Sequence, residues 1–297
     1  MDSVTVRTIS VGGGEDDALL VGVLEWPGSG PPLLLVHATS FCAEVWGPAW
    51  GAARAAGLAD RRALAIDQRG HGRSGTPSEP SAYAWTRVAG DLVAVLAEES
   101  AAEEPAFLVG HSSGGTAALA AAAICPERVA GVAVVEPVLF EPPAPGADAD
   151  SFAGSRLFAK RALKRRSRFE DRVAARAALQ SRFPYSGFAD SALEACLDGG
   201  FEVTEAGELV LRCAPETEAW AYQGAAALDL WPLIPRIEAP VQVIAAEHSA
   251  MPPPLLDRLR RCRGGVRVDQ VAGTTHFAVM ERPEPVGEMI ADFIREL

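Results

Sequence analysis

The stretch Ala106-Phe107-Leu108-Val109-Gly110-His111-Ser112-Ser113-Gly114-Gly115 decides the fold of this 297-residue chain. Four apolar residues lead directly into the pattern Gly-x-Ser-x-Gly, and an alanine-rich run over residues 116–124 follows. That order predicts a strand, a sharp turn and a helix, the setting in which the pattern forms a nucleophile elbow. Glycines at 110 and 114 allow the close backbone approach that a side chain would block. We therefore expect the Ser112 hydroxyl to stand at the carboxyl end of a strand, with the Ser113 amide facing the same site.

Composition excludes several classes of function. The net charge of −12 argues against non-specific nucleic-acid binding, which needs a cationic surface. No apolar run approaches the length of a membrane span, and the first residues show no signal-peptide pattern. The five cysteines are scattered without C-x-x-C spacing, so neither a disulfide framework nor a metal site is expected. We predict a cytoplasmic protein that needs no metal or organic cofactor and binds neither nucleic acid nor membrane.

Short apolar runs alternate with amphipathic segments along most of the chain. Residues 4–11 and 18–26 alternate around a glycine-rich turn, which predicts an antiparallel hairpin. Largely apolar runs are typical of strands buried on both faces of a parallel sheet, and they occupy residues 33–36, 63–66, 106–109, 129–135 and 241–245. Helices are predicted between them, at residues 46–57, 86–99 and 285–297. The pattern predicts an α/β fold with a mostly parallel, doubly wound sheet.

The alternation of short apolar runs with amphipathic segments stops after residue 135. A segment rich in proline, alanine and acidic residues follows, and residues 151–230 then read as helical, including one helical stretch over 157–180. The basic residues of that stretch interleave with apolar ones, which favours a solvated helix face over an anion-binding site. We predict a core of residues 1–137 and 231–297 with an inserted helical cap at 138–230. The cap is expected over the carboxyl ends of the strands, where open α/β sheets bind ligands.

A serine nucleophile needs a general base, and the base needs an orienting acid. Of the five histidines, His276 lies in a loop between the last predicted strand and the final helix. When the order along the chain is nucleophile, acid and histidine, the base comes last. We therefore predict His276 as the base.

Several motifs in order resemble the α/β-hydrolase superfamily over almost the full length. They are Leu33-Leu34-Leu35-Val36-His37, Asp67-Gln68-Arg69-Gly70-His71-Gly72-Arg73-Ser74, the elbow, Pro240-Val241-Gln242-Val243-Ile244 and His276-Phe277. The resemblance implies an oxyanion hole built from the backbone amides of Thr39 and Ser113. It also implies a hydrolase that uses no cofactor.

The position of the acid departs from the family pattern. Ser249 occupies the place where most relatives carry an aspartate, and a serine cannot balance the charge of an imidazolium. Two carboxylates could substitute: Glu136 at the end of the strand after the elbow helix, and Glu247 two residues before the usual position. Haloalkane dehalogenases and zearalenone-type lactone hydrolases carry the acid at the first of these places. We favour Glu136 because a strand end followed by proline fixes the side-chain direction.

The nucleophile predicts acyl transfer. Relatives that open epoxides or remove halides carry an aspartate at the elbow, so Ser112 indicates hydrolysis of a carboxylic ester or lactone through an acyl-enzyme. Two alternatives stay open: hydrolysis of a carbon–carbon bond, as in meta-cleavage-product hydrolases, and a non-catalytic receptor on the same fold. The expected partner is a small to medium, hydrophobic ester or lactone. The candidate pocket walls are Phe41, Trp46, Phe140, Trp220 and Phe277.

Overall fold

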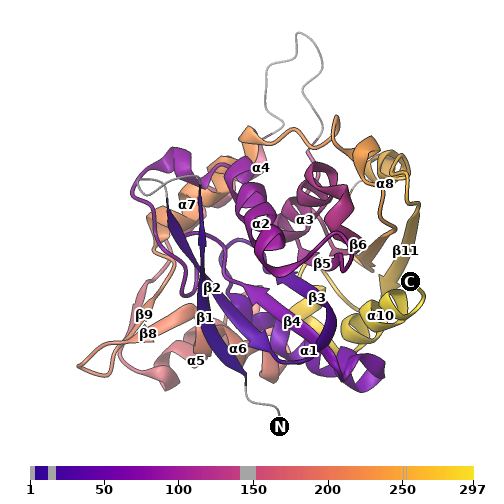
Figure 1. Ribbon diagram of the computed structural model, residues 1–297. Coiled ribbons are helices and arrows are strands. Elements are labelled where there is room, and N and C mark those ends of the chain that lie inside the picture. Colours follow the sequence, from indigo (N-terminus) through magenta and orange to yellow (C-terminus); the bar gives the residue numbers. More distant parts are fainter. Residues whose placement is uncertain (1–3, 13–17, 141–151, 250, 252) are drawn as a thin grey trace.

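The computed structural model describes residues 4–12, 18–140, 152–249, 251 and 253–297 (Figure 1). Its centre is a sheet of eight strands in the order β1-β2-β4-β3-β5-β6-β10-β11. The predicted hairpin is confirmed, because β1 and β2 pair antiparallel, and from β4 to β11 every neighbouring pair is parallel. The strands are β1 Thr5–Val11, β2 Leu19–Trp26, β3 Ser29–Val36, β4 Arg61–Ile66, β5 Ala106–His111, β6 Val129–Val135, β10 Val241–Ala246 and β11 Val266–Val271.

Helices cover both faces of the sheet, which explains the continuous apolar runs. Alternate residues of a strand point to opposite faces, so Leu34 packs in one core cluster and its neighbours Leu33 and Leu35 pack in the other. The first cluster includes the apolar faces of α2 Trp85–Glu99 and α3 Ser113–Ile124. The second includes α1 Gly47–Ala53 and α10 Pro283–Arg295. Short helices α8 Pro253–Leu259 and α9 Ala278–Glu281 complete the C-terminal part.

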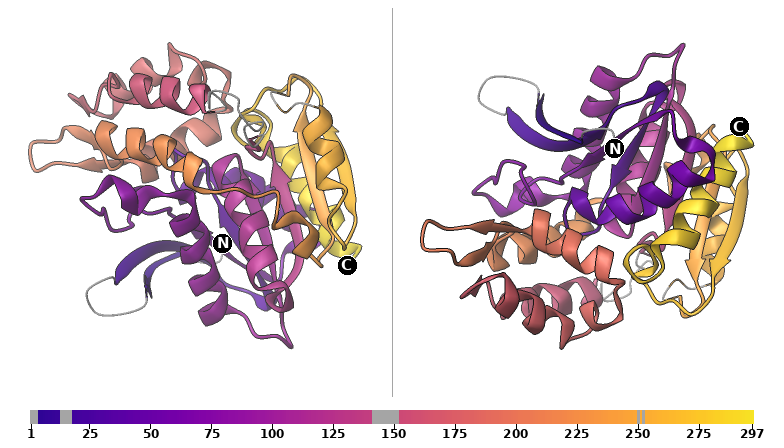
Figure 2. Two further views of the ribbon diagram at one scale, coloured as in Figure 1. Left: turned by 90° about the horizontal axis from the view of Figure 1, so that it is seen from above. Right: turned by 90° about the horizontal axis from the view of Figure 1, so that it is seen from below.

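The chain between β6 and β10 forms a separate group of elements on one side of the sheet (Figure 2). Its helices are α4 Ala153–Ala162, α5 Arg172–Gln180, α6 Asp190–Gly200 and α7 Pro215–Gln223. Its strands, β7 Arg168–Phe169, β8 Phe201–Val203 and β9 Leu209–Leu211, form a small sheet in the order β7-β9-β8. The side chains inside this group make a core of their own around Phe169, Leu193 and Phe201.

The single helical stretch predicted over residues 157–180 is wrong. The first helix ends at Ala162, and the chain then runs through β7, which pairs with β9 and buries Phe169. Helix α5 begins after Asp171, whose carboxylate accepts the amide of Ala174 at 2.7 Å. Pairing with a distant strand outweighs the local helical pattern here.

The segment rich in proline, alanine and acidic residues is predicted over residues 136–150, and its part from 141 to 150 lies outside the described residues. In the described part of the chain, no helix combines the length and the apolar character that crossing a membrane requires.

Candidate active site

Ser112 sits in a strained turn between β5 and α3. Its φ of 54° and ψ of −118° lie in a region that non-glycine residues rarely adopt. A Cβ at Gly110 would come within 2.4 Å of the Gly114 carbonyl oxygen, and one at Gly114 within 2.3 Å of the Val36 carbonyl oxygen. Both positions therefore require glycine. The turn places the Ser112 side chain at the carboxyl end of the central strand.

His276 lies directly against this serine. Its Nε2 atom is 2.8 Å from Ser112 Oγ, close enough to take the hydroxyl proton. The loop that carries the ring is held at two points: the amide and hydroxyl of Thr275 both donate to the Glu281 carboxylate at 2.7 Å. In addition, His111 Nε2 donates to the His276 carbonyl at 2.7 Å. His111, which is part of the elbow, thus holds the backbone of His276.

Glu136 faces the other side of the imidazole. Its Oε2 atom is 3.5 Å from His276 Nδ1, and its Oε1 accepts the amide of Ala246 at 2.8 Å. The residue is 1% exposed and has a φ of 45°, so the backbone at the end of β6 is itself strained. Burial raises the pKa of this carboxyl, but hydrogen bonds from His276, Ser249 and the Ala246 amide outweigh burial and leave the pKa below its usual value. The side chain is therefore a carboxylate at neutral pH.

The structure does not bring Glu247 to the imidazole. This side chain is exposed, and its carboxylate accepts the amide of Gly273 at 2.6 Å. Ser249, which stands where an aspartate was expected, forms a hydrogen bond with Glu136 and accepts the amide of Met251 at 3.0 Å. Of the two carboxylates left open by the sequence, only Glu136 contacts His276.

The two residues predicted for the oxyanion hole are in direct contact. The Thr39 amide donates to Ser113 Oγ at 2.8 Å, and the Thr39 hydroxyl donates to the same atom at 3.1 Å. Both residues are buried and line the space next to Ser112. The Thr39 amide thus points to the Ser113 side chain in the elbow. The sequence pattern did not predict this contact.

A cavity of about 500 Å³ is lined by Ser112, His276 and Glu136. Its size suits a small-molecule ligand. The predicted wall residues Phe41, Phe140 and Phe277 line it. Trp46 and Trp220 do not: Trp46 is buried in the core beneath the sheet, and Trp220 packs against Tyr83 with ring centroids 5.7 Å apart. Trp46 lies in a short helical turn, Ala43–Trp46, that leads into α1 and therefore packs with α1 in the core.

Comparison with known proteins gives a consistent result. A sequence model of the alpha/beta hydrolase family matches residues 33–288. The chain belongs to the alpha/beta hydrolase family. It is 29% identical over 273 residues to 2-(acetamidomethylene)succinate hydrolase from Mesorhizobium japonicum, an alignment that covers 90% of this chain and 89% of the relative.

Two further similarities differ in extent. The crystal structure of E-2-(acetamidomethylene)succinate hydrolase superposes with a TM-score of 0.76 and 26% identity over 98% of this chain and 100% of that chain. An epoxide hydrolase from Caballeronia sordidicola is 37% identical over 101 residues, 34% of this chain and 29% of the relative. The first similarity spans the core and the segment between β6 and β10, whereas the second covers about a third of the chain.

Several cavity residues of this hydrolase were not predicted from the sequence. Aromatic side chains from distant elements complete the walls, and a histidine and an arginine contribute polar groups: Trp85, Phe158, Phe183, Tyr222, His248 and Arg161. The spacing of residues 154, 158 and 161 along α4 is the one signal that could have indicated a shared helix face. Which face of α4 meets the core is decided by its packing against α7.

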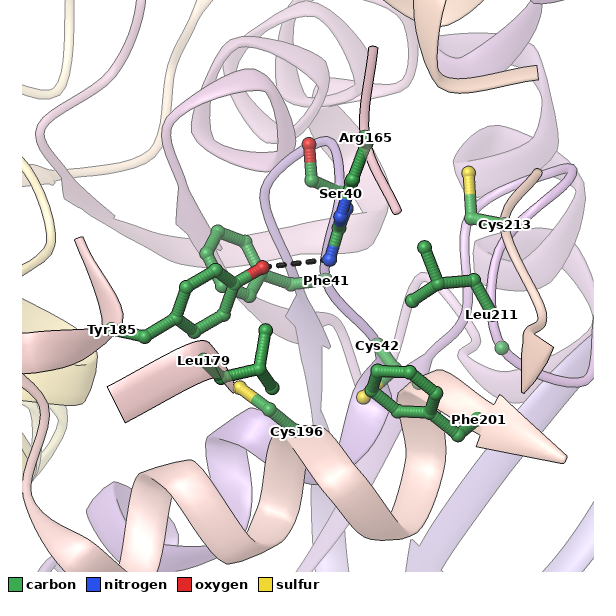
Figure 3. A pocket seen from close by; sticks show the side chains of 12 residues that line it. Ser40, Phe41, Cys42, Arg165, Leu179, Tyr185, Cys196, Phe201, Leu211 and Cys213 are labelled. Carbon is green, nitrogen blue, oxygen red and sulfur yellow. Dashed lines mark hydrogen bonds between the residues drawn. The ribbon is translucent and has the colours of Figure 1, made fainter. Parts of the chain in front are cut away.

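A polar cluster joins the segment after β6 to the loop that carries Thr39. Arg165 donates to Glu218 at 2.6 Å and to the Tyr185 hydroxyl at 2.7 Å, the second contact drawn in Figure 3. Ser40 donates to the other oxygen of Glu218 at 2.6 Å, so its hydroxyl accepts the Tyr222 hydroxyl at 3.0 Å. The space beside this cluster measures about 10 Å³, room for roughly one water molecule.

Proposed function

We propose that this protein is a serine hydrolase that cleaves a carboxylic ester or lactone through an acyl-enzyme intermediate. The observation that carries the proposal is the continuous contact from Ser112 through His276 to Glu136 at the wall of a cavity of about 500 Å³. A hydroxyl with a base at 2.8 Å and a buried carboxylate behind the base matches the requirements for an activated nucleophile.

Each residue has a defined part in the proposed reaction. Ser112 Oγ attacks the carbonyl carbon while His276 Nε2 takes the hydroxyl proton, and Glu136 stabilises the imidazolium that forms. The oxyanion accepts hydrogen bonds from the Ser113 amide and from the Thr39 amide, which must first leave Ser113 Oγ. When the tetrahedral intermediate collapses, His276 returns the proton to the leaving oxygen. A water molecule, deprotonated by the same histidine, then attacks the acyl-enzyme, and His276 passes that proton to Ser112 Oγ as the carboxylic acid leaves.

The relative that matches 90% of the chain favours a second candidate reaction. Its name describes a hydrolase for a succinate that carries an acetamido group, so amide hydrolysis is the alternative to ester hydrolysis at the same site. The attack by Ser112 is identical in the two reactions. They differ in the leaving group, because His276 must protonate a nitrogen for an amide and an oxygen for an ester.

Labelling with a fluorophosphonate probe tests whether Ser112 is an activated nucleophile. We expect the wild type to be labelled and to hydrolyse p-nitrophenyl butyrate, and Ser112→Ala to show neither activity. Absence of labelling in the folded wild type would contradict the proposal and favour a non-catalytic receptor. A panel that contains a lactone, an N-acyl enamine and a dienoate diketone then separates ester, amide and carbon–carbon bond hydrolysis by their relative kcat/KM.

A further inference from the structure

The basic residues in and after α4 divide between two environments. Lys160 and Lys164 are exposed to solvent and line neither cavity, as expected for a solvated helix face. Arg161 lines the cavity that contains Ser112, and Arg165, four residues later, reaches the buried side of the same segment. Arg165 lies beyond the end of α4 at Ala162 and its charge is paired with Glu218, so of these two described arginines only Arg161 presents its charge to the cavity that contains Ser112.

Arg161 lies on the same strip of α4 as the other residues that line the cavity. Gly154, Ser155 and Phe158 precede it at helical spacing, and all of them line the same space. The Arg161 guanidinium lies over the Phe158 ring, 5.9 Å from its centroid. Because Arg161 lines the cavity and is also exposed, it marks the solvent-facing end of the pocket.

Within the described residues, Arg161 lacks the kind of carboxylate partner that Arg165 has. Arg165 pairs with Glu218 at 2.6 Å, whereas no carboxylate of the described residues is paired with Arg161. Among the described residues that line the cavity, Arg161 is the only lysine or arginine. The only carboxylate there, Glu136, is bound by His276, Ser249 and the Ala246 amide. The remaining walls are largely aromatic and aliphatic.

We propose that Arg161 binds a carboxylate of the substrate, so that the pocket takes small esters or related acyl compounds that carry a free acid group. The planar guanidinium can receive a carboxylate through two parallel hydrogen bonds at the outer end of the pocket. The scissile carbonyl then lies at Ser112, with the apolar walls around the chain between the two groups. This inference rests on the proposed hydrolase function and narrows its substrate class.

A pair of esters of which one carries an added terminal carboxylate tests the proposal. We expect the wild type to hydrolyse mono-p-nitrophenyl glutarate with a higher kcat/KM than p-nitrophenyl butyrate. In Arg161→Gln the ratio of the two kcat/KM values should fall roughly 10- to 100-fold, as expected for loss of a charge-assisted hydrogen bond. Arg161→Lys should restore part of the ratio, because the charge returns without the two-pronged geometry.

The matched control is Lys160→Gln, which removes the same charge from the neighbouring residue on the exposed face. We expect its ratio to stay within about twofold of the wild type, since Lys160 does not line the cavity and cannot hydrogen-bond to the carboxylate of a bound substrate. An equal fall in Arg161→Gln and Lys160→Gln would overturn the proposal, because it would show a general effect of net charge. A wild type that prefers the neutral ester would also overturn it.

Binding of glutarate to Ser112→Ala separates this inference from the proposed function. The variant retains the cavity but lacks the nucleophile, and calorimetry should detect glutarate binding that Arg161→Gln in the same background abolishes. If the wild type is not labelled by the fluorophosphonate yet glutarate binds through Arg161, the function fails and the anion site stands. If labelling succeeds and Arg161→Gln leaves glutarate affinity unchanged, the anion site fails and the hydrolase stands.

Discussion

The Glu136 carboxylate reaches His276 from the end of β6, and Ser249 at the end of β10 hydrogen-bonds to the same carboxylate. The residue at the usual acid position, Ser249, therefore supports the carboxylate on the neighbouring strand that we propose as the acid. A serine fits this part because its hydroxyl donates one hydrogen bond and accepts the Met251 amide. At the residue scale, the carboxylate that contacts His276 lies one strand away from the usual acid position and still borders the cavity.

Replacing each candidate acid by its amide tests this arrangement. In Glu136→Gln we expect kcat for p-nitrophenyl butyrate to fall roughly 10²- to 10⁴-fold, because no carboxylate then orients and stabilises the histidine. Glu247→Gln is the matched control, and its kcat should remain within about threefold of the wild type. A large loss in Glu247→Gln with a near-normal rate in Glu136→Gln would reverse the assignment.

The contact between Thr39 and Ser113 leads to a second prediction at this scale. Ser113 Oγ accepts the Thr39 amide that an oxyanion would need, so the two compete for one N–H. A typical hydrogen bond contributes about 1 kcal/mol, so Ser113→Ala should raise kcat by about fivefold. Steady-state kinetics with p-nitrophenyl butyrate measures the change. A fall in kcat would show instead that the Ser113 hydroxyl itself donates to the oxyanion.

At the scale of elements, the buried ion pair between Arg165 and Glu218 connects the segment after β6 to the loop that carries Thr39. Arg165 follows α4, Glu218 lies on α7, and Ser40 belongs to the core loop after β3. The Arg165 and Glu218 side chains are 19% and 7% exposed, so water compensates little for the loss of either one. The pair thus couples the position of α4 and α7 to the loop beside the nucleophile.

Breaking this pair should destabilise the protein strongly. Arg165→Met leaves the Glu218 carboxylate buried without its cation, and we expect the free energy of unfolding to fall by about 3 kcal/mol. Urea denaturation measures the change. The control is Arg168→Met, which removes an exposed pair with Glu208 and should cost less than about 1 kcal/mol. Equal losses of stability in the two variants would show that the Arg165–Glu218 pair does not hold these elements together. Adding Glu218→Leu to Arg165→Met removes the unpaired carboxylate and should recover part of the lost free energy of unfolding.

At the scale of the whole molecule, the parallel sheet places two neutral histidines below the site. His37 directly follows β3 and is 0% exposed. His111 is the last residue of the neighbouring strand β5 and is 1% exposed. Burial and then the neighbouring histidines, His71 for the first and His276 for the second, lower the pKa of each to about 3. In the unfolded chain such groups titrate near 6.5. The folded state therefore binds fewer protons than the unfolded state between pH 6.5 and 3, and stability is lost as pH falls through that range.

The pH dependence of unfolding tests this linkage. Each buried histidine should lower the free energy of unfolding by about 1.4 kcal/mol per pH unit below 6.5. His111→Gln keeps a side-chain N–H for the His276 carbonyl but removes the titrating group. Between pH 8 and pH 5 the variant should therefore gain about 2 kcal/mol relative to the wild type. The difference in free energy of unfolding between variant and wild type at pH 8 measures the pH-independent packing cost of the substitution. The same difference at pH 5 as at pH 8 would contradict the prediction that His111 is buried in its neutral form.

Much of the fold follows from local patterns. The elbow, the hairpin and the apolar strands appear in the structure within a few residues of their predicted bounds, because side-chain period and glycine positions act over short distances. The helical stretch over 157–180 failed because Phe169 pairs into a sheet with residues about 40 positions later. A local period carries no information about such a partner.

The sequence by itself determined the strained serine turn, the parallel sheet and the expectation that His276 is the base. Only the tertiary structure decided that Glu136 and not Glu247 contacts this base, that Ser113 binds the Thr39 amide, and that Arg161 lines the cavity. The physical reason is the range of the interactions. Turns and strands are encoded by neighbouring residues, whereas these contacts depend on which strand ends lie side by side and on which face of α4 packs toward the core.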